Sequence, residues 1–135
     1  MKLVFVDANV FLRFFTTDNE GQHKQAAALF KGAAQGEIAL VTGPPVLFEI
    51  TWTLRSAYKQ PNEKILDALS AIIALPGLQL TDAGLVEEAL ALARRSGQEF
   101  ADAYIAASAR DATADEIATF NRKHFENLDA ALHTF

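Results

Sequence analysis

Short apolar runs alternate along the chain with longer stretches in which apolar residues recur every three or four positions. The short runs are rich in Val, Leu, Ile and Phe and have the length of buried strands. The longer stretches have the periodicity of helices that bury one face. The pattern predicts strands over residues 2–6, 37–42, 78–80 and 116–120, and a terminal strand over residues 132–135.

Residues that begin and end helices bound the longer stretches. Asp18, Asn62 and Asp82 stand where N-caps are expected, and glycine or proline follows several predicted helix ends. Pro44 and Pro45 suit the first turn of a helix. We predict helices over residues 8–15, 19–34, 46–54, 63–75, 83–97 and 99–112, and a short helix over residues 123–127.

Strands that alternate with helices predict an α/β fold, a three-layer α/β/α sandwich around a mainly parallel sheet of four to five strands. The length of 135 residues suits a single domain over residues 1–135. In such folds, ligands bind beyond the carboxyl ends of the strands. The polar residues that follow each strand are therefore the first candidates for a functional site.

The composition excludes several classes of protein. The chain has no Cys, which excludes a disulfide scaffold, a thiolate nucleophile and a zinc ribbon. No apolar run approaches the roughly 20 residues of a membrane span, and no signal-peptide cleavage site follows the first strand, so we expect a cytoplasmic protein with no membrane partner. The net charge of −5 argues against non-specific DNA coating. A cation held by acidic residues would still attract phosphate.

Two acids stand in positions that structure alone explains poorly. Asp7 directly follows the first predicted strand, where it is also a favoured N-cap for the next helix. Glu49 lies between Phe48 and Ile50 in an apolar helix, with no Lys or Arg four residues away. A charge in apolar surroundings is costly unless it is paired or binds a metal. A solvated helix face is the alternative for Glu49.

Two further segments carry oxygen ligands. Asp102 stands in the first turn of an Ala-rich helix, where an acid also interacts favourably with the helix dipole, and Glu99 lies three residues earlier. Thr119 and Asn121 leave the last internal strand with a hydroxyl and an amide, although Asn is also common in turns. Clustered carboxylates repel one another and so favour a bound cation. Hard oxygen ligands without Cys favour Mg²⁺ or Mn²⁺ over Zn²⁺.

Four segments together resemble the motifs of PIN domains. Residues 5–12 (FVDANVFL) resemble the opening motif, and residues 45–50 (PVLFEI) resemble the second. Residues 100–107 (FADAYIAA) and 118–125 (ATFNRKHF) resemble the third and fourth. Their order and spacing agree over nearly the whole chain, and the length suits the compact toxin branch of the family.

The resemblance implies a Mg²⁺- or Mn²⁺-dependent endoribonuclease, the VapC-type toxin of a toxin–antitoxin pair. It assigns Asp7, Glu49 and Asp102 to the metal-binding acidic positions and to catalysis. Asn121 takes a catalytic position where Asp is commonest, which removes a charge that would help to hold a second ion. Asn9, Glu99 and Thr119 would support the acids. The resemblance also implies a cognate antitoxin protein and a homodimer.

Basic and aromatic residues complete the expectations. Arg13, Arg122, Lys123 and His124 are candidates for contact with RNA phosphates. His23 and His133 have no evident acid or hydroxyl partner in the sequence, so we expect them at the surface. We expect most of the Phe residues and Trp52 in the core, because they fall on apolar faces.

Two other functions fit parts of the sequence. A phosphohydrolase with Asp7 as nucleophile would also place an acid after the first strand, but such chemistry normally wants a second acid where Asn9 stands. A catalytically weakened PIN-like module that binds RNA or protein would follow if Asn121 abolished metal binding. The chain has no Gly-rich nucleotide-binding loop and no nucleophile elbow.

Overall fold

A computed structural model describes residues 1–135 and contains a parallel sheet of three strands in the order β1-β2-β3. In this sheet Leu3 pairs with Ala39, and Leu40 pairs with Leu78. Because the strands adjoin in chain order, each crossover moves the chain one position along the sheet. The strands are β1 (Leu3–Phe5), β2 (Ala39–Thr42) and β3 (Leu78–Leu80).

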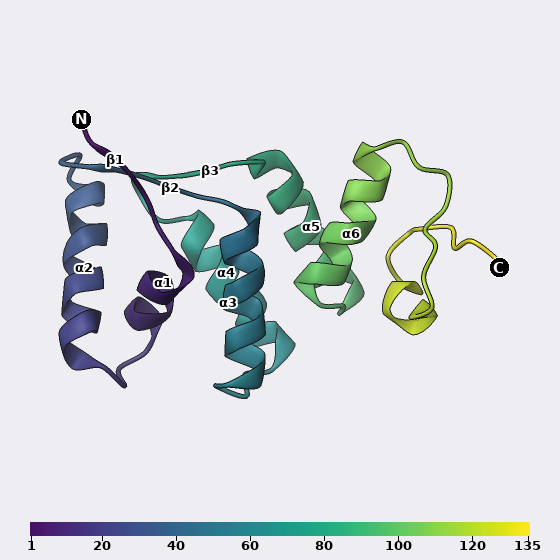
Figure 1. Ribbon diagram of the computed structural model, residues 1–135, viewed down its shortest axis with the longest axis horizontal. Helices are drawn as coiled ribbons and strands as arrows, with labels where there is room; N and C mark the ends of the chain where they lie inside the picture. The colour runs from purple at the N-terminus through teal and green to yellow at the C-terminus, as the bar shows by residue number, and fades with distance from the viewer.

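Helices occupy the stretches in which the sequence predicts them. None of them combines the length and the apolar character that crossing a bilayer requires. Figure 1 shows α2 at one end of the molecule and α6 toward the other, with α3 and α4 between them. The helices are α1 (Ala8–Phe15), α2 (Glu20–Ala34), α3 (Pro44–Ser56), α4 (Asn62–Ile73), α5 (Ala83–Ser96) and α6 (Phe100–Asp111), followed by the 3₁₀ helix η1 (Arg122–Phe125).

Two predicted N-caps are wrong. Asn19 caps α2, and its side-chain oxygen accepts a hydrogen bond from the backbone N–H of Gln22 at 3.0 Å. Asp18 lies one residue earlier and binds other side chains instead. Asn62 is the first residue of α4, and its amide donates to the carbonyl oxygen of Gln98 at 2.9 Å. The side chain of Asn62 therefore joins the start of α4 to the loop before α6.

The sheet is smaller than the sequence predicts, because it has three strands and not four or five. The predicted strands over residues 116–120 and 132–135 are reduced to one parallel bridge between Ile117 and Leu132. Figure 1 shows this C-terminal segment beyond α6, at the opposite end of the long axis from β1. The strand propensity of a segment depends on its own residues, whereas strand formation also requires a neighbouring strand to pair with. Because residues 116–120 do not join the sheet, β1 pairs on one side only and is an edge strand.

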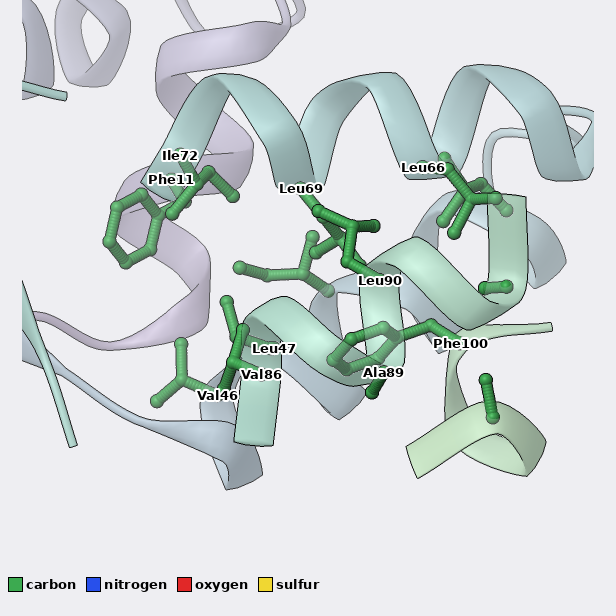
Figure 2. Close-up of a cluster of buried hydrophobic side chains, with 14 of the residues drawn as sticks. Phe11, Val46, Leu47, Leu66, Leu69, Ile72, Val86, Ala89, Leu90 and Phe100 are labelled. Atoms are coloured by element: carbon green, nitrogen blue, oxygen red, sulfur yellow. The ribbon is translucent and has the colours of Figure 1, made fainter. Parts of the chain in front are cut away.

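The core lies mainly between the helices. Figure 2 shows side chains from five helices in one cluster, among them Phe11, Leu47, Leu69, Val86 and Phe100. Each of these five is at most 1% exposed. Burial of one such side chain contributes about 1.5–3 kcal/mol relative to an exposed position. The cluster therefore joins α1, α3 and α4 to the α5–α6 pair and holds the two halves of the chain together.

The expectation that aromatic residues lie in the core is wrong at several positions. Trp52 is 66% exposed on α3. Four Phe side chains are also exposed: Phe5, Phe15, Phe120 and Phe135. Phe11, Phe30, Phe100 and Phe125 are buried as expected. Phe14 and Phe48 are partly buried. A helix or strand pattern identifies an apolar face, but it does not reveal whether another element covers that face.

Gly77 lies at a close approach between β3 and α2. Its φ of 79° is in the left-handed region that favours glycine. A Cβ at this position would lie 2.5 Å from the carbonyl oxygen of Ala33. The carbonyl oxygen of Gly77 accepts a hydrogen bond from Leu40 N at 2.9 Å, which extends the pairing of β2 with β3. Only glycine lets the chain enter β3 this close to α2.

Candidate active site

Asp7 lies immediately after β1, at the carboxyl edge of the sheet. Its Oδ1 accepts a hydrogen bond from Ala8 N at 2.7 Å. Asp7 is therefore the N-cap of α1, which is one of the two roles that the sequence suggests for it. Val6 N donates to Val41 O at 2.8 Å and continues the pairing of β1 with β2 by one residue. The backbone before Asp7 is therefore fixed by the sheet, while its exposed side chain faces solvent.

Thr42 is a site neighbour that the sequence reasoning missed. Its side chain is fully buried, and its hydroxyl donates a hydrogen bond to Val6 O at 2.9 Å. Thr42 ends β2 beside the end of β1, and it thereby fixes the residue that precedes Asp7. The available signal was a hydroxyl residue at the carboxyl end of the second predicted strand, just before Gly43.

Glu49 lies on the exposed side of α3, not in apolar surroundings. Its neighbour Phe48 packs on α6, with its ring 5.6 Å from that of Phe100 and 5.1 Å from that of Tyr104. Glu49 forms no hydrogen bond and no ion pair with another residue of the chain. The sequence-based expectation of an enclosed charge is wrong, because the flanking apolar residues face α6 and the core, and Glu49 does not.

Asp102 is the acid with the most perturbed environment. It lies in the first turn of α6, and its side chain is 16% exposed. Burial raises the pKa of its carboxyl above the ordinary 3.8, His124 opposes the shift, and nearby Glu99 adds to it. Arg55 also lowers this pKa, and its Nε lies 3.1 Å from Oε1 of Glu99. Shifted carboxyl groups of this kind concentrate at functional sites.

The fourth predicted motif lies away from Asp7. Thr119 Oγ1 accepts a hydrogen bond from Asn121 N at 3.0 Å, so the two residues form a local turn in the C-terminal segment. Both belong to the segment that follows α6, and Figure 1 shows this segment beyond α6 and apart from β1. Asn9 lies on the exposed surface of α1, two residues after Asp7. Asn9 is thus the one predicted supporting residue that shares an element with the first motif.

The basic side chains that are candidates for RNA binding differ in whether groups of the protein already bind them. Arg13 is held by Asp18 at 3.0 Å and by Gln22 Oε1 at 2.8 Å. Arg122 donates to the carbonyl oxygen of His133 at 3.1 Å. Lys123 is exposed and forms no hydrogen bond or ion pair. Lys123 is therefore the one residue of 122–124 whose charged group has no partner within the protein.

The three histidines all have partners. His124 Nδ1 lies 3.6 Å from Asp102 Oδ2. His133 lies on the surface as expected, but its Nδ1 is 3.0 Å from Glu116 Oε1, so the expectation that it lacks an acid partner is wrong. His23 is half-buried, with Nδ1 3.0 Å from the carbonyl oxygen of Arg13. The partners are distant in sequence, so no local sequence pattern reveals these contacts.

One cavity lies between α1 and α2 and not between the acids. Its volume is about 410 Å³, and polar side chains from both helices line it together with Val10, Ala26 and Leu29. The polar lining residues are Asn9, Arg13, Gln22 and Gln25. Asn9, which lines the cavity, stands two residues after Asp7 in the chain. The cavity provides amide groups for a ligand but no carboxylate.

The acids do not form a shared metal site in this arrangement. No three His, Asp or Glu side chains lie close enough to hold one ion. Asp7 lies at the end of β1, Glu49 on α3 and Asp102 at the start of α6. The donor set as placed therefore does not fit a three-carboxylate metal centre.

A three-stranded parallel sheet with helices packed around it, and an acid directly after its first strand, defines an α/β protein. The model of the PIN domain family matches residues 4–131, nearly the whole chain. The chain belongs to the PIN domain family. PIN domains are generally nucleases, which are hydrolases. Among curated proteins, none matches the chain closely enough to add a substrate or a partner.

Proposed function

We propose that the chain is an endoribonuclease, the VapC-type toxin of a toxin–antitoxin pair, which hydrolyses RNA phosphodiester bonds. The family match over residues 4–131 carries the proposal, because all four motif segments lie within it in the expected order. Asp7, Glu49 and Asp102 stand at the acidic motif positions. The same match favours a nuclease over a phosphohydrolase that would use Asp7 as nucleophile.

The region around Asp102 supports this assignment. His124 belongs to the basic run 122–124, and its contact with Asp102 holds that run beside the first turn of α6. An RNA phosphate bound by Lys123 would therefore lie near the acid whose pKa burial raises. A positioned carboxyl group of this kind contributes about 10²–10⁴-fold as a general acid or base.

We also propose that Mg²⁺ or Mn²⁺ is the cofactor, as is typical of PIN nucleases. This part of the proposal rests on the family, because the acids as placed do not share an ion. The assignments of Asp7, Glu49, Asp102 and Asn121 as catalytic residues are part of the same proposal.

Cleavage of RNA by purified protein tests the proposal. We expect wild type to cut RNA when Mg²⁺ or Mn²⁺ is present and to lose activity in EDTA. Asp7→Asn and Asp102→Asn should each lower the rate about 100-fold or more. Asp115→Asn, which removes an exposed acid outside the motifs, is the matched control and should cut normally.

Expression in growing cells tests the toxin role. Wild type should slow growth and create new RNA 5′ ends, and Asp7→Asn should do neither. Co-expression of an antitoxin encoded beside the toxin should restore growth. Equal growth and identical RNA 5′ ends with wild type and Asp7→Asn would contradict the toxin assignment.

The separation of the acids also favours a second candidate, a PIN-like module that binds RNA or protein without cleaving it. Asn121, where an acid is commonest, points in the same direction. Titration calorimetry with Mn²⁺ separates the two candidates. Saturable binding that Asp7→Asn abolishes supports the nuclease, whereas no Mn²⁺ binding by wild type supports the binding module.

A further inference from the structure

Trp52 projects from α3 into solvent. Its side chain is 66% exposed, no other ring stacks on the indole, and the indole N–H has no hydrogen-bond partner in the protein. The backbone beneath it is fixed, because Ser56 Oγ donates a hydrogen bond to Trp52 O at 2.7 Å within the helix. Such a side chain offers a large aromatic surface at low entropic cost. A single exposed apolar residue is common, so the surroundings of Trp52 decide its interpretation.

The face of α3 that carries Trp52 is turned toward the start of α6. Phe48 lies four residues before Trp52 and Arg55 three residues after it, so the three side chains share this face. The ring of Phe48 lies 5.6 Å from that of Phe100. Arg55 Nε lies 3.1 Å from Glu99 Oε1. Trp52 therefore stands beside the α3–α6 contact, with a packed ring on one side and a guanidinium on the other.

Two of the motif acids belong to the same surroundings. Glu49 is exposed and lies three residues before Trp52, so it is a neighbour of the indole along α3. Asp102 lies in the first turn of α6. Burial raises the pKa of Asp102, and the charges of Glu99 and Arg55, which raise and lower it, also reach this carboxyl. Arg55 thus connects the surroundings of Trp52 with Asp102.

Arg55 has hydrogen-bond donors left for a phosphate group. Its guanidinium carries five N–H groups, and the ion pair with Glu99 uses Nε. Its side chain is 35% exposed, so part of the guanidinium is open to solvent. Arginine binds phosphate oxygens through two parallel N–H groups of this kind. The carboxylates nearby repel phosphate, so Arg55 determines where an RNA backbone can approach this surface.

We propose that a base of single-stranded RNA stacks on Trp52 and that Arg55 binds the adjoining phosphate. The proposed nuclease function supplies RNA as the ligand, and the inference adds residues that hold the strand. An exposed indole stacks on any base, and a guanidinium that binds phosphate does not read the sequence. In a duplex the bases stack on one another, so the contact selects single strands over duplexes. A strand held here passes the first turn of α6, where Asp102 lies.

RNA fits this surface better than a second protein chain does. A protein surface packed on Trp52 would also cover Arg55 and Glu49, and the removal of charged groups from water is costly. A nucleotide presents an aromatic face to Trp52 and an anion to Arg55, so it provides a partner for each. The charge next to the exposed ring therefore favours a nucleic acid as the occupant.

Fluorescence tests the stacking directly, because Trp52 is the only tryptophan. Wild type in EDTA is titrated with a single-stranded oligoadenylate of about ten nucleotides, a typical length for a single-strand site. EDTA prevents metal-dependent cleavage and should not prevent a contact made by Trp52 and Arg55. We expect saturable quenching by the single strand and none by a duplex RNA of the same length. Absence of quenching by the single strand would overturn the proposal, whether or not the strand binds elsewhere.

Substitutions separate the two contacts, with binding measured by the fluorescence anisotropy of a labelled strand. Trp52→Ala should weaken binding about 5- to 150-fold, and Trp52→Tyr should retain most of the affinity. Arg55→Gln should weaken binding and reduce the slope of log K against log salt concentration by about 0.7, the value for one phosphate contact. Unchanged affinity in Trp52→Ala would overturn the stacking, and an unchanged salt slope in Arg55→Gln would overturn the phosphate contact.

Two matched controls should bind the strand as wild type does. Phe15→Ala removes an aromatic side chain that is 38% exposed on α1. Arg94→Gln removes a guanidinium of α5 whose Nη1 lies 2.8 Å from Asp67 Oδ1, so it breaks an ion pair as Arg55→Gln does. Circular dichroism of each variant shows whether it is folded. A loss of affinity in the controls equal to that in Trp52→Ala and Arg55→Gln would overturn the assignment to this surface.

The outcome does not depend on cleavage. Quenching of Trp52 by RNA in a protein that cuts no RNA in Mg²⁺ would refute the proposed nuclease and support the stacking. Cleavage of RNA with no quenching of Trp52 would support the nuclease and overturn the stacking. Trp52 fluorescence that iodide cannot quench in the RNA-free protein would show that a second chain covers this part of α3, and it would also overturn the proposal.

Discussion

Nδ1 of His124 lies 3.6 Å from Oδ2 of Asp102, across 22 positions of sequence that include the whole of α6 after its first turn. The contact brings the basic run that follows the last predicted strand to the start of the helix that carries the third motif. The carboxylate is mostly buried, whereas the imidazole is more than half exposed. Solvent therefore reaches the pair mainly from the histidine side.

Asp102→Asn should stabilise the protein at neutral pH. Burial raises the pKa of Asp102 in the folded state, so ionisation costs more there than in the unfolded chain. The free energy of unfolding should fall as pH rises from the ordinary 3.8 through the raised folded pKa. The substitution removes this loss, so Tm should increase at neutral pH and change little well below 3.8.

Thermal unfolding followed by circular dichroism at both pH values measures this effect. Glu63→Gln is the matched control, because Glu63 is exposed in the first turn of α4. That substitution should leave Tm unchanged or lower it slightly, since it removes a favourable interaction with the helix dipole. A decrease in Tm for Asp102→Asn at neutral pH would contradict the expected sign.

Tyr58→Phe should raise the pKa of Asp18. The Tyr58 hydroxyl donates to Asp18 Oδ2 at 2.8 Å, and this hydrogen bond is the main cause of the lowered pKa, ahead of Thr16 and Arg13. Because the folded pKa is lowered, the resulting stability is present above 3.8 and is lost as pH falls through the folded value. Carboxyl-detected NMR titration measures the change, and Thr16→Val should produce a smaller rise.

Gly77→Ala should destabilise the fold much more than Gly97→Ala. Both glycines have a left-handed φ, of 79° and 76°. Substitution at such positions costs about 1 kcal/mol from the backbone alone. At Gly77 the new methyl also meets the Ala33 carbonyl oxygen, whereas at Gly97 nothing lies within 4 Å. Urea unfolding should show a loss at least about 2 kcal/mol larger for Gly77→Ala. Equal losses would contradict the close approach.

Trp52→Ala should cost little stability, about 1 kcal/mol or less, because Trp52 is 66% exposed. Leu47→Ala, on the same helix and fully buried, should cost about 2–5 kcal/mol. Trp52 is the only tryptophan, so its fluorescence reports this position alone. Iodide should quench it strongly in the folded protein. Fluorescence protected from iodide in a dimer would show that a second chain covers this part of α3.

The sequence predicts the helices well and the end of the sheet poorly. Apolar periodicity is local, so it locates α1 to α6 and the three strands within a few residues. Residues 116–120 also carry a strand pattern, but pairing depends on where α6 carries the segment. That path depends on contacts of Phe100 and Phe125 with distant elements, which no local pattern contains.

Some residues of the candidate site can likewise be predicted from the sequence, and others cannot. The sequence identifies Asp7 and Asp102 as acids at element ends, and both have that location. It misplaces Glu49, because apolar neighbours in sequence do not reveal which side of α3 stays uncovered. It misses Thr42, whose only function visible in the fold is its hydrogen bond to Val6. Contacts between distant residues decide these points.

The order of the strands has a consequence during translation. Since β1, β2 and β3 adjoin in the order of synthesis, the sheet can assemble on the ribosome before residues 83–135 have been made. The helices α5 and α6 then pack last, onto the core that α1, α3 and α4 have already brought together. The second half of the chain would therefore fold on a template that the first half supplies during its own synthesis.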